Sequence, residues 1–417
     1  MTAANFDAAA ELLESLLPTC SFYAIDEEMT GIMLNKETAP SMADTCEQRY
    51  AKMKRVVMPH EVEPRTSRAR AGRALLLARP RPGQVREFSL MQVGICLFHE
   101  QEDGSLLSRP FNFYVFPGAA SRRRIVMDAS TAHFHRSNNM DFNKWVLQGV
   151  PFLSRAEYDA EAEALLAEPQ EPTPQARGPR VTLTREDDVA FMSTTMATVH
   201  AWLAEPWAED GEPAELALPA CNPFLRRALF EEVEQLRAGR PELQAESRAL
   251  EGEADSRKKQ VVLRRLSAAA QRARAEAARA QQLASLTQRA GFLRVWRALC
   301  ASGKPLVGHN LLYDLLFLHD HFEAPLPPSL AACKASLHAR LPLVWDTKLL
   351  ATRCGRFAET ALGPLHAACV GGEPPSPVAV SFPPGFGRYD GGEQAHEAGY
   401  RVRVRVRIRV RVRVRVS

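Results

Sequence analysis

The sequence predicts an α/β protein whose strand-forming segments lie in two regions separated by a long helical stretch. Residues 22–28, 88–98 and 111–116 are aromatic and β-branched runs bounded by polar turns, a pattern typical of strands. Residues 184–301 are helical in character, and residues 306–371 return to a compact α/β texture. With 417 residues, 46% of them hydrophobic, the chain can bury two or three packed cores.

Hydropathy and cysteine usage indicate an intracellular protein without a membrane span. No stretch approaches the roughly 18 consecutive apolar residues that a membrane span needs. Residues 5–17 carry acidic residues among alanines and leucines, which predicts an amphipathic helix rather than a signal peptide. The eight cysteines include no C-x-x-C pair, as expected for reduced thiols.

Several segments differ in amino-acid composition from the globular regions. Residues 58–86 are rich in Arg, Pro and Ala, and predict an irregular insertion. A linker follows at 166–184, and residues 268–286 predict a solvated helix, with a coiled-coil partner site as the alternative. Eight arginines in the Arg–Val tail, residues 401–417, take the formal net charge from −4 for residues 1–400 to +4 for the chain. A polyanion would therefore bind local patches rather than an overall positive field.

Two carboxylates lie at the end of the first predicted strand. Asp26 and Glu28 are two residues apart in an extended run, so their side chains project from the same face. Such oxygen ligands can share a divalent ion, and two-metal phosphodiester hydrolysis uses them to generate hydroxide and to steady the leaving 3′ oxygen. A solvated strand face is the alternative, which the apolar run at residues 22–25 disfavours.

A third carboxylate lies among apolar residues much later in the chain. Residues 306–317 predict a short strand, a turn and a helix that Asn310 caps. Asp314 lies one turn into this helix among leucines, where a carboxylate is either paired or bound to a metal. His319 and Asp320 fit an exposed helix end.

Six segments resemble, in the same order, those of the poly(A)-specific ribonucleases, deadenylases of the DEDD class of exonucleases. They are S-F-Y-A-I-D-E-E-M-T-G-I (21–32), F-N-F-Y-V-F-P (111–117), D-F-N-K (141–144), G-H-N-L-L-Y-D (308–314), D-T-K-L-L-A (346–351) and H-E-A-G-Y (396–400). The resemblance covers most of residues 5–400 outside the insertion. It implies an RNase H-like α/β nuclease fold interrupted by a small helical or α+β domain of the R-x-x-x-H type.

The same resemblance implies a division of the chain into domains. The parts are a nuclease domain in two halves, 1–165 and 291–400, a linker at 166–184, an R-x-x-x-H-like domain at 185–255, a charged helical connector at 256–290 and the tail at 401–417. No R-x-x-x-H signature is present within 185–255, so the resemblance does not secure a nucleic-acid role for that domain.

By resemblance, Asp26, Glu28 and Asp314 are three of the four acidic ligands of a two-ion Mg²⁺ site. His396 is the histidine that helps to deprotonate the attacking water, with a polar helix-end histidine as the alternative. The fourth ligand would follow H-E-A-G-Y directly, but this chain has Arg401 there and breaks off before that carboxylate. A fixed cation in place of a metal-binding anion weakens divalent ion binding, so we expect impaired activity.

The residues that resemble the family's RNA contacts are Met29, Ile32, Phe113 and Lys348. In the family these positions contact the terminal adenylates, by apolar packing on bases and by a charge on phosphate. Met29 stands in place of the usual phenylalanine, which weakens stacking to a thioether contact. Core packing is the alternative for Met29 and Phe113.

The Arg–Val tail has two interpretations. Its period of two would place arginines on one face of a strand, where they could bind RNA phosphates nonspecifically. Alternatively, the tail is a simple repeat read through from an unspliced intron, and residues 58–86 could share that origin.

The implied function is a Mg²⁺-dependent 3′→5′ exoribonuclease that shortens mRNA poly(A) tails and releases AMP. By resemblance its partner is the poly(A) 3′ end of mRNA, its oligomeric state a homodimer and its location the nucleus and cytoplasm. The alternative is a catalytically inactive RNA-binding or dimerising variant of the same family. Arg401 favours the alternative, whereas the intact acidic residues favour the enzyme.

Overall fold

In a computed structural model the chain forms two compact units, a large unit of residues 1–162 with 286–417 and a small unit of residues 163–285. The structure describes residues 1–32, 39–41, 43–58, 88–119, 121, 123, 125–167, 180–207, 214–237, 239–240, 242–249, 259–371 and 378–387. The predicted insertion, apart from Met58, lies outside the described residues, as do His396 and the Arg–Val tail.

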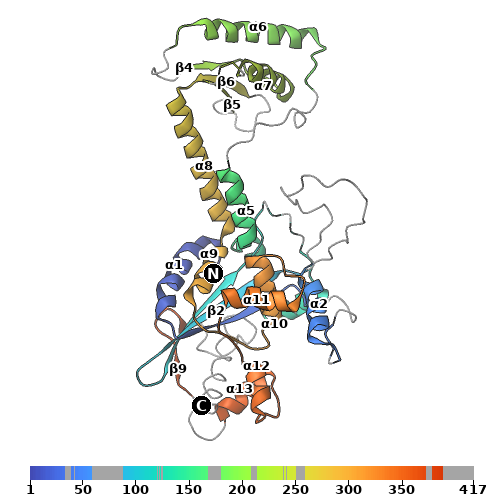
Figure 1. Ribbon diagram of the computed structural model, residues 1–417, viewed down its shortest axis with the longest axis vertical. Coiled ribbons are helices and arrows are strands. Elements are labelled where there is room, and N and C mark those ends of the chain that lie inside the picture. Colours follow the sequence, from blue (N-terminus) through green and yellow to red (C-terminus); the bar gives the residue numbers. More distant parts are fainter. Residues whose placement is uncertain are drawn as a thin grey trace. The chain divides into compact units, whose positions relative to one another are not determined.

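The large unit is built on a six-stranded mixed sheet with the strand order β8-β7-β1-β2-β3-β9 (Figure 1). The strands are β1 (Phe22–Met29), β2 (Leu90–Glu100), β3 (Leu106–Tyr114), β7 (Leu306–Gly308), β8 (Val344–Asp346) and β9 (Val380–Ser381). Strand β2 is antiparallel to β1 and β3, whereas β7 is parallel to β1 and β8. This topology confirms the RNase H-like α/β fold.

The two faces of this sheet bury different side chains. Tyr23 and Ile25 of β1 join the main hydrophobic core, whereas Phe22 and Ala24 point to the opposite face and join a smaller cluster. The helices that contribute to the main core include α1 (Phe6–Leu16), α2 (Cys46–Val57), α9 (Leu293–Ser302), α10 (Leu312–Leu318) and α11 (Leu330–Arg340). The predicted amphipathic helix at 5–17 is confirmed as α1, which buries one side on α9 and the core.

The remaining elements are mainly helical. They are α3 (Ala129–Ser137), α4 (Phe142–Gln148), α5 (Arg155–Leu166), α8 (Ala268–Ala290), a π-helix (His319–Glu323), α12 (Thr347–Cys354), α13 (Leu362–Gly371) and two 3₁₀ turns, Ala3–Asn5 and Leu17–Thr19. Most side chains of α8 are exposed, as predicted for a solvated helix. Within the described ranges, no helix has the length and apolarity to cross a membrane.

The small unit is an α+β domain rather than an all-helical segment. Its elements are α6 (Glu186–Ala204), β4 (Ala214–Ala217), α7 (Pro223–Arg237), β5 (Leu243–Arg248) and β6 (Gln260–Arg265). The strands form a three-stranded antiparallel sheet in the order β4-β6-β5, with α6 and α7 packed in one hydrophobic cluster with it. Because β6 is the central strand, the domain extends beyond the predicted boundary at 255 into the predicted connector.

Candidate active site

Asp26 and Glu28 lie at the carboxyl end of β1, a central strand of the large sheet. By alternation they continue the face of Phe22 and Ala24, so both carboxylates project to the same side, as predicted. Asp26 is 2% exposed and Glu28 5% exposed. A solvated strand face is therefore excluded for this pair.

The residues opposite these carboxylates on the neighbouring strand are uncharged. Gly94 of β2 is directly opposite Asp26, and Gln92 is directly opposite Glu28. Gly94 places no side chain next to Asp26. The side-chain oxygen Oε1 of Gln92 accepts a hydrogen bond from the side-chain Nδ2 of Asn112 at 3.3 Å. The β1–β2 register shifts between Glu28 and Met29. Irregularities of this kind re-aim side chains and recur beside active sites.

The chain turns after β1 at a rigid corner. The N–H of Thr30 donates to the Ser89 carbonyl, and the N–H of Ser89 donates to the Thr30 hydroxyl, both at 2.9 Å. A Cβ on Gly31 would lie 2.2 Å from the Phe88 ring, so only glycine allows this approach. The corner leaves the Ile32 side chain 49% exposed beside the site.

A second turn brings α10 to the same edge of the sheet. Strand β7 is parallel to β1 and ends at Gly308, and α10 begins four residues later. Asp346 accepts hydrogen bonds from the N–H groups of Asn310 (3.0 Å) and Leu311 (2.8 Å), and it also caps α12. The predicted cap by Asn310 is wrong: the N-cap of α10 is Leu311 without a side-chain cap, Asn310 has φ 59°, and Asp346 of the neighbouring strand β8 holds the turn before the helix.

Asp314 lies in the first turn of α10 and is 7% exposed, so its predicted burial is confirmed. Among the residues that the structure places, no three His, Cys, Asp or Glu side chains form a group arranged to hold a metal ion. The structure thus brings Asp26 and Glu28 together on one strand without showing Asp314 completing a three-ligand cluster. His396 and Arg401 belong to the segment after residue 387, which is not described.

His135 of α3 lies beside Glu28, and no motif in the sequence singled it out. Its Nε2 is 2.9 Å from the Met29 carbonyl oxygen, and its Nδ1 is 3.9 Å from Glu28 Oε2. Because a carbonyl oxygen only accepts, Nε2 must carry a proton in this contact. His133 lies two residues earlier in the same helix but is exposed. Only the fold therefore distinguishes the two histidines.

The four predicted RNA contacts have different environments. Phe113 is fully buried and packs edge-to-face against Phe6 and Phe292, so the structure places it in the core, the alternative stated above. Met29 is partly buried against the main core. Ile32 is exposed and Lys348 partly exposed, near the ends of β1 and β8 respectively.

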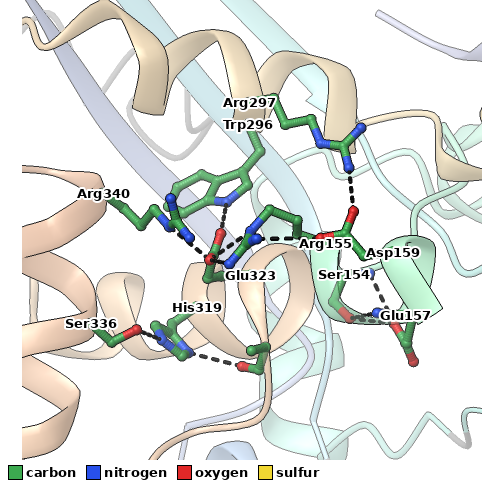
Figure 2. Close-up of polar contacts among 11 residues, drawn as sticks. Ser154, Arg155, Glu157, Asp159, Trp296, Arg297, His319, Glu323, Ser336 and Arg340 are labelled. Atoms are coloured by element: carbon green, nitrogen blue, oxygen red, sulfur yellow. Dashed lines mark hydrogen bonds and ion pairs between the residues drawn. The ribbon is translucent and has the colours of Figure 1, made fainter. Parts of the chain in front are cut away.

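A buried polar cluster forms at the π-helix, where the sequence predicted an exposed helix end. The predicted exposure of His319 and Asp320 is wrong, since they are 1% and 0% exposed in the π-helix. His319 Nδ1 is 2.9 Å from the Ala324 carbonyl, and Nε2 is 2.8 Å from the Ser336 hydroxyl (Figure 2). Burial lowers the pKa of His319, which favours its neutral form.

Glu323 in the same π-helix is held by three donors (Figure 2). Its carboxylate accepts from Arg155 Nε at 2.8 Å, Arg340 Nε at 2.8 Å and Trp296 Nε1 at 3.2 Å. Burial opposes ionisation of this group, but the hydrogen bonds from Arg155 and Trp296 and the charge of Arg155 hold the pKa of Glu323 below its ordinary value. The contacts join α5, α9, the π-helix and α11.

The sheet of the small unit carries an ion-pair network. Glu215 contacts Arg248 (2.7 Å) and Arg264 (2.9 Å), and Glu246 contacts Arg264 (3.1 Å) and Arg274. These arginines already have carboxylate partners, so phosphate would have to compete for them. The missing R-x-x-x-H signature and this network both argue against a strong RNA-binding surface on this sheet.

A divalent cation fits the chemistry of the β1 carboxylates. Both are oxygen donors, both are buried, and the residue opposite Asp26 has no side chain. Thiolate chemistry does not compete near this strand: burial raises the pKa of Cys20 to about 11 and that of Cys300 to about 12. All eight cysteines are free.

Comparison with known proteins gives one family. The family model for CAF1 family ribonuclease matches residues 1–62 and 83–401. Poly(A)-specific ribonuclease PARN of Pongo abelii is 28% identical over 425 residues, which cover 95% of this chain and 59% of that protein. The pre-piRNA 3′-exonuclease trimmer of Bombyx mori is 25% identical over 351 residues, which cover 83% of this chain and 56% of that protein. The chain thus spans less than two thirds of the length of these relatives.

A solved structure also matches part of the chain. It is S. pombe Pop2p in its Mg²⁺ and Mn²⁺ bound form, with 15% sequence identity and a TM-score of 0.22. The match covers 40% of this chain and 50% of that one. A likeness at this level carries no structural argument.

Proposed function

We infer the function from one premise, that the chain belongs to the CAF1 family of ribonucleases. The proposal is a divalent-metal-dependent 3′→5′ exoribonuclease that shortens poly(A) tails and releases AMP. Mg²⁺ is the proposed ion, and the poly(A) 3′ end of mRNA is the proposed partner. Homodimerisation and a location in nucleus and cytoplasm remain part of this proposal.

The observation that carries the proposal is the position of Asp26 and Glu28. They are buried on one face at the end of a central strand, opposite a residue without a side chain. Carboxylate oxygens are the ligands that hard divalent cations take, and buried carboxylates cluster at functional sites. Phosphodiester hydrolysis with oxygen-bound divalent ions uses such a pair.

Each residue has a separate task in the proposed site. Bound divalent ions would supply a hydroxide nucleophile and stabilise the leaving 3′ oxygen. Asp26 and Glu28 would hold the ions from β1, Asp314 from α10, and His396 would accept the proton of the attacking water. The exposed Ile32 and the partly exposed Lys348 would contact the terminal nucleotides.

A direct test uses a 5′-labelled RNA that ends in a run of adenylates, incubated with the full chain and Mg²⁺ or Mn²⁺. We expect shortening by single nucleotides from the 3′ end and release of AMP, and loss of both in Glu28→Gln. His133→Gln is the matched control, because this side chain is exposed on α3. Endonucleolytic fragments, or an unchanged rate in Glu28→Gln, would contradict the proposal.

Arg401 makes a second, separable prediction. It occupies the position where the resemblance implies the fourth acidic ligand, so the chain as it stands is proposed to be impaired. Arg401→Asp should raise the rate of AMP release about a hundredfold or more, the scale of one well-placed electrostatic group. Equal rates would show that position 401 contributes no ligand.

The second candidate function is a catalytically inactive variant that binds RNA or dimerises with active relatives. The feature that favours it is Arg401 in place of the aspartate. It predicts binding of A-tailed RNA without AMP release, and inhibition when the chain is mixed with an active deadenylase. AMP release that Glu28→Gln abolishes would eliminate this candidate.

A further inference from the structure

Strand β8 presents exposed apolar side chains at the end of the large sheet. It is the last strand in the order β8-β7-β1-β2-β3-β9, and its residue Trp345 is 41% exposed. Leu343, directly before the strand, is 47% exposed. The other tryptophans of the large unit, Trp145 and Trp296, are 5% and 1% exposed. Large apolar side chains that gather on a surface mark binding sites, so this edge of the sheet is a candidate for one.

The strand register places Trp345 on the same face of the sheet as Asp26 and Glu28. Trp345 pairs with Val307 of β7, and Val307 pairs with Ala24 of β1. Paired residues of parallel strands point to the same side, and alternation along β1 continues that side to the two carboxylates. With about 4.8 Å between strands and about 3.3 Å per residue, the Cα atoms of Trp345 and Asp26 are about 12 Å apart. At about 3.4 Å per stacked nucleotide, three or four nucleotides span that distance.

The backbone on both sides of Trp345 is held in place. The N–H of Leu306 in β7 donates to the Leu343 carbonyl at 2.8 Å. Asp346, the next residue after Trp345, accepts hydrogen bonds from two N–H groups in the turn before α10 and caps α12. The indole is therefore attached to an ordered strand, and binding through it costs less conformational entropy than binding through a loop.

Basic side chains adjoin this exposed ring. Helix α12 begins directly after β8, and residues 347–356 contain Lys348, Arg353 and Arg356 but no acidic residue. Lys348 is partly exposed, and both arginines are exposed. Single-stranded nucleic acid binds where bases stack on aromatic rings and cations contact the phosphates. The charge of this segment thus favours an RNA strand over an apolar protein partner.

We propose that Trp345 stacks on an adenine base of the RNA substrate, upstream of the terminal nucleotide. The ring lies on the carboxylate face and is displaced from Asp26 by about 12 Å, so the base it contacts belongs to the part of the strand that has not yet reached the reacting bond. This inference rests on the proposed function, because it adds a substrate contact to the same site.

Four variants separate stacking from other roles. Trp345→Phe keeps an aromatic ring, whereas Trp345→Ala removes it. Leu147→Ala is the control for losing an exposed apolar side chain, since Leu147 is 77% exposed on α4. Trp207→Phe is the control for fluorescence, since Trp207 is partly exposed in the small unit. Urea unfolding of each variant reports whether the fold is retained.

The experiment is a titration of the full chain with octaadenylate in EDTA, where no metal-dependent cleavage occurs. We expect quenching of tryptophan fluorescence in the wild type and in Trp207→Phe, and its loss in Trp345→Phe. By anisotropy of labelled octaadenylate, Trp345→Ala should weaken binding at least about fivefold, the lower end of what base–aromatic stacking contributes. Trp345→Phe should restore part of that loss, and Leu147→Ala should bind as the wild type does.

Activity gives a second readout. With Mg²⁺ supplied, Trp345→Ala should raise the KM for A-tailed RNA by about the same factor and leave kcat nearly unchanged, because the lost contact is made before and during the reaction alike. A fall in kcat at unchanged KM would overturn a stacking role for Trp345.

The two proposals fail in different ways. Quenching that persists in Trp345→Phe, or an unchanged RNA affinity in Trp345→Ala, would overturn the role of Trp345 alone. A change of mass by light scattering in Trp345→Ala, with RNA affinity unchanged, would overturn it by showing that this face binds protein. Quenching by octaadenylate without AMP release when Mg²⁺ is supplied would contradict the proposed exoribonuclease and leave the stacking contact in place.

Discussion

Two of the places where the large unit buries carboxylates, β1 and the π-helix, give these groups different neighbours. Glu323 in the π-helix accepts from two arginines and an indole N–H, and its side chain is 4% exposed. Asp26 and Glu28 on β1 are buried to a similar extent, but the residues opposite them on β2 are the uncharged Gly94 and Gln92. Burial is similar, but Glu323 is paired with two arginines, whereas Glu28 has His135 as a neighbour at 3.9 Å.

We propose that Glu323 is a structural carboxylate and that Asp26 and Glu28 are functional ones. Protein cations surround Glu323 and join four helices through it, so its ionisation contributes to folding. The β1 carboxylates are placed at a strand end beside a glycine and a register shift, an arrangement that suits a bound cation. Sites of function commonly give up stability in this way.

The largest expected effect is on catalysis at β1. Asp26→Asn and Glu28→Gln should each lower the rate of AMP release at least about a hundredfold, while the free energy of unfolding without metal changes by less than about 1 kcal/mol. Glu323→Gln should instead lower the free energy of unfolding strongly and change the rate of AMP release only slightly. Initial rates and urea midpoints of the three variants measure both quantities. A large loss of stability in Asp26→Asn would contradict the proposed difference between the β1 carboxylates and Glu323.

The next effect is on stability at Glu323. Glu323→Gln should lower the free energy of unfolding by about 3 kcal/mol, because two arginines lose the carboxylate that pairs with them. Glu161→Gln is the control: Glu161 pairs with Arg289 on the surface and should cost less than about 1 kcal/mol. Equal costs in urea unfolding would show that the buried network contributes no more than a surface pair.

The pH dependence of stability tests the same network. The pKa of Glu323 is lowered below its ordinary 4.5 in the folded protein, so its contribution is present above that value and is lost as pH falls through the folded pKa. The stability difference between wild type and Glu323→Gln should therefore be nearly constant from pH 7 to about pH 5 and should shrink as the pH falls below 4.5. Urea unfolding at a series of pH values measures it, and a difference that grows in acid would contradict the assignment.

The smallest expected effect lies in the small unit. Arg264 contacts both Glu215 and Glu246, so Arg264→Gln should change the affinity for A-tailed RNA by less than about twofold. Fluorescence anisotropy at two salt concentrations measures this. A large loss of affinity together with a weaker salt dependence would show that the sheet of this unit binds phosphate after all.

Local patterns predicted the parts of this molecule that depend on neighbours in sequence. Strand alternation placed Asp26 and Glu28 on one face, and the surrounding leucines predicted the burial of Asp314. Asn310 was a reasonable cap by type, but the pairing of β7 with β8 brings Asp346 to that turn from 36 residues away. That contact holds the turn before α10 and depends on tertiary structure.

The other features that the sequence did not predict also depend on contacts between residues far apart in the chain. Arg155 reaches Glu323 across 168 residues, and His135 reaches Met29 across 106. A phenylalanine such as Phe113 can either stack on a base or pack in a core. Only its contact with Phe6 in the fold shows that it packs in the core. Sequence patterns identified β1, β2, part of β3, β7 and the acidic residues, whereas β4, β5 and β6 lay in a stretch predicted as helical and, like the contacts between distant segments, needed the fold.

The most direct measurement is Mn²⁺ and Mg²⁺ titration of the wild type beside the double variant Asp26→Asn/Glu28→Gln, followed by calorimetry and by the thermal midpoint of unfolding. Binding to the folded state raises that midpoint with ion concentration. The wild type should bind and be stabilised, and the double variant should lose both effects while remaining folded. Ion binding and stabilisation that persist unchanged in the double variant would contradict the placement of the catalytic cation site at the end of β1.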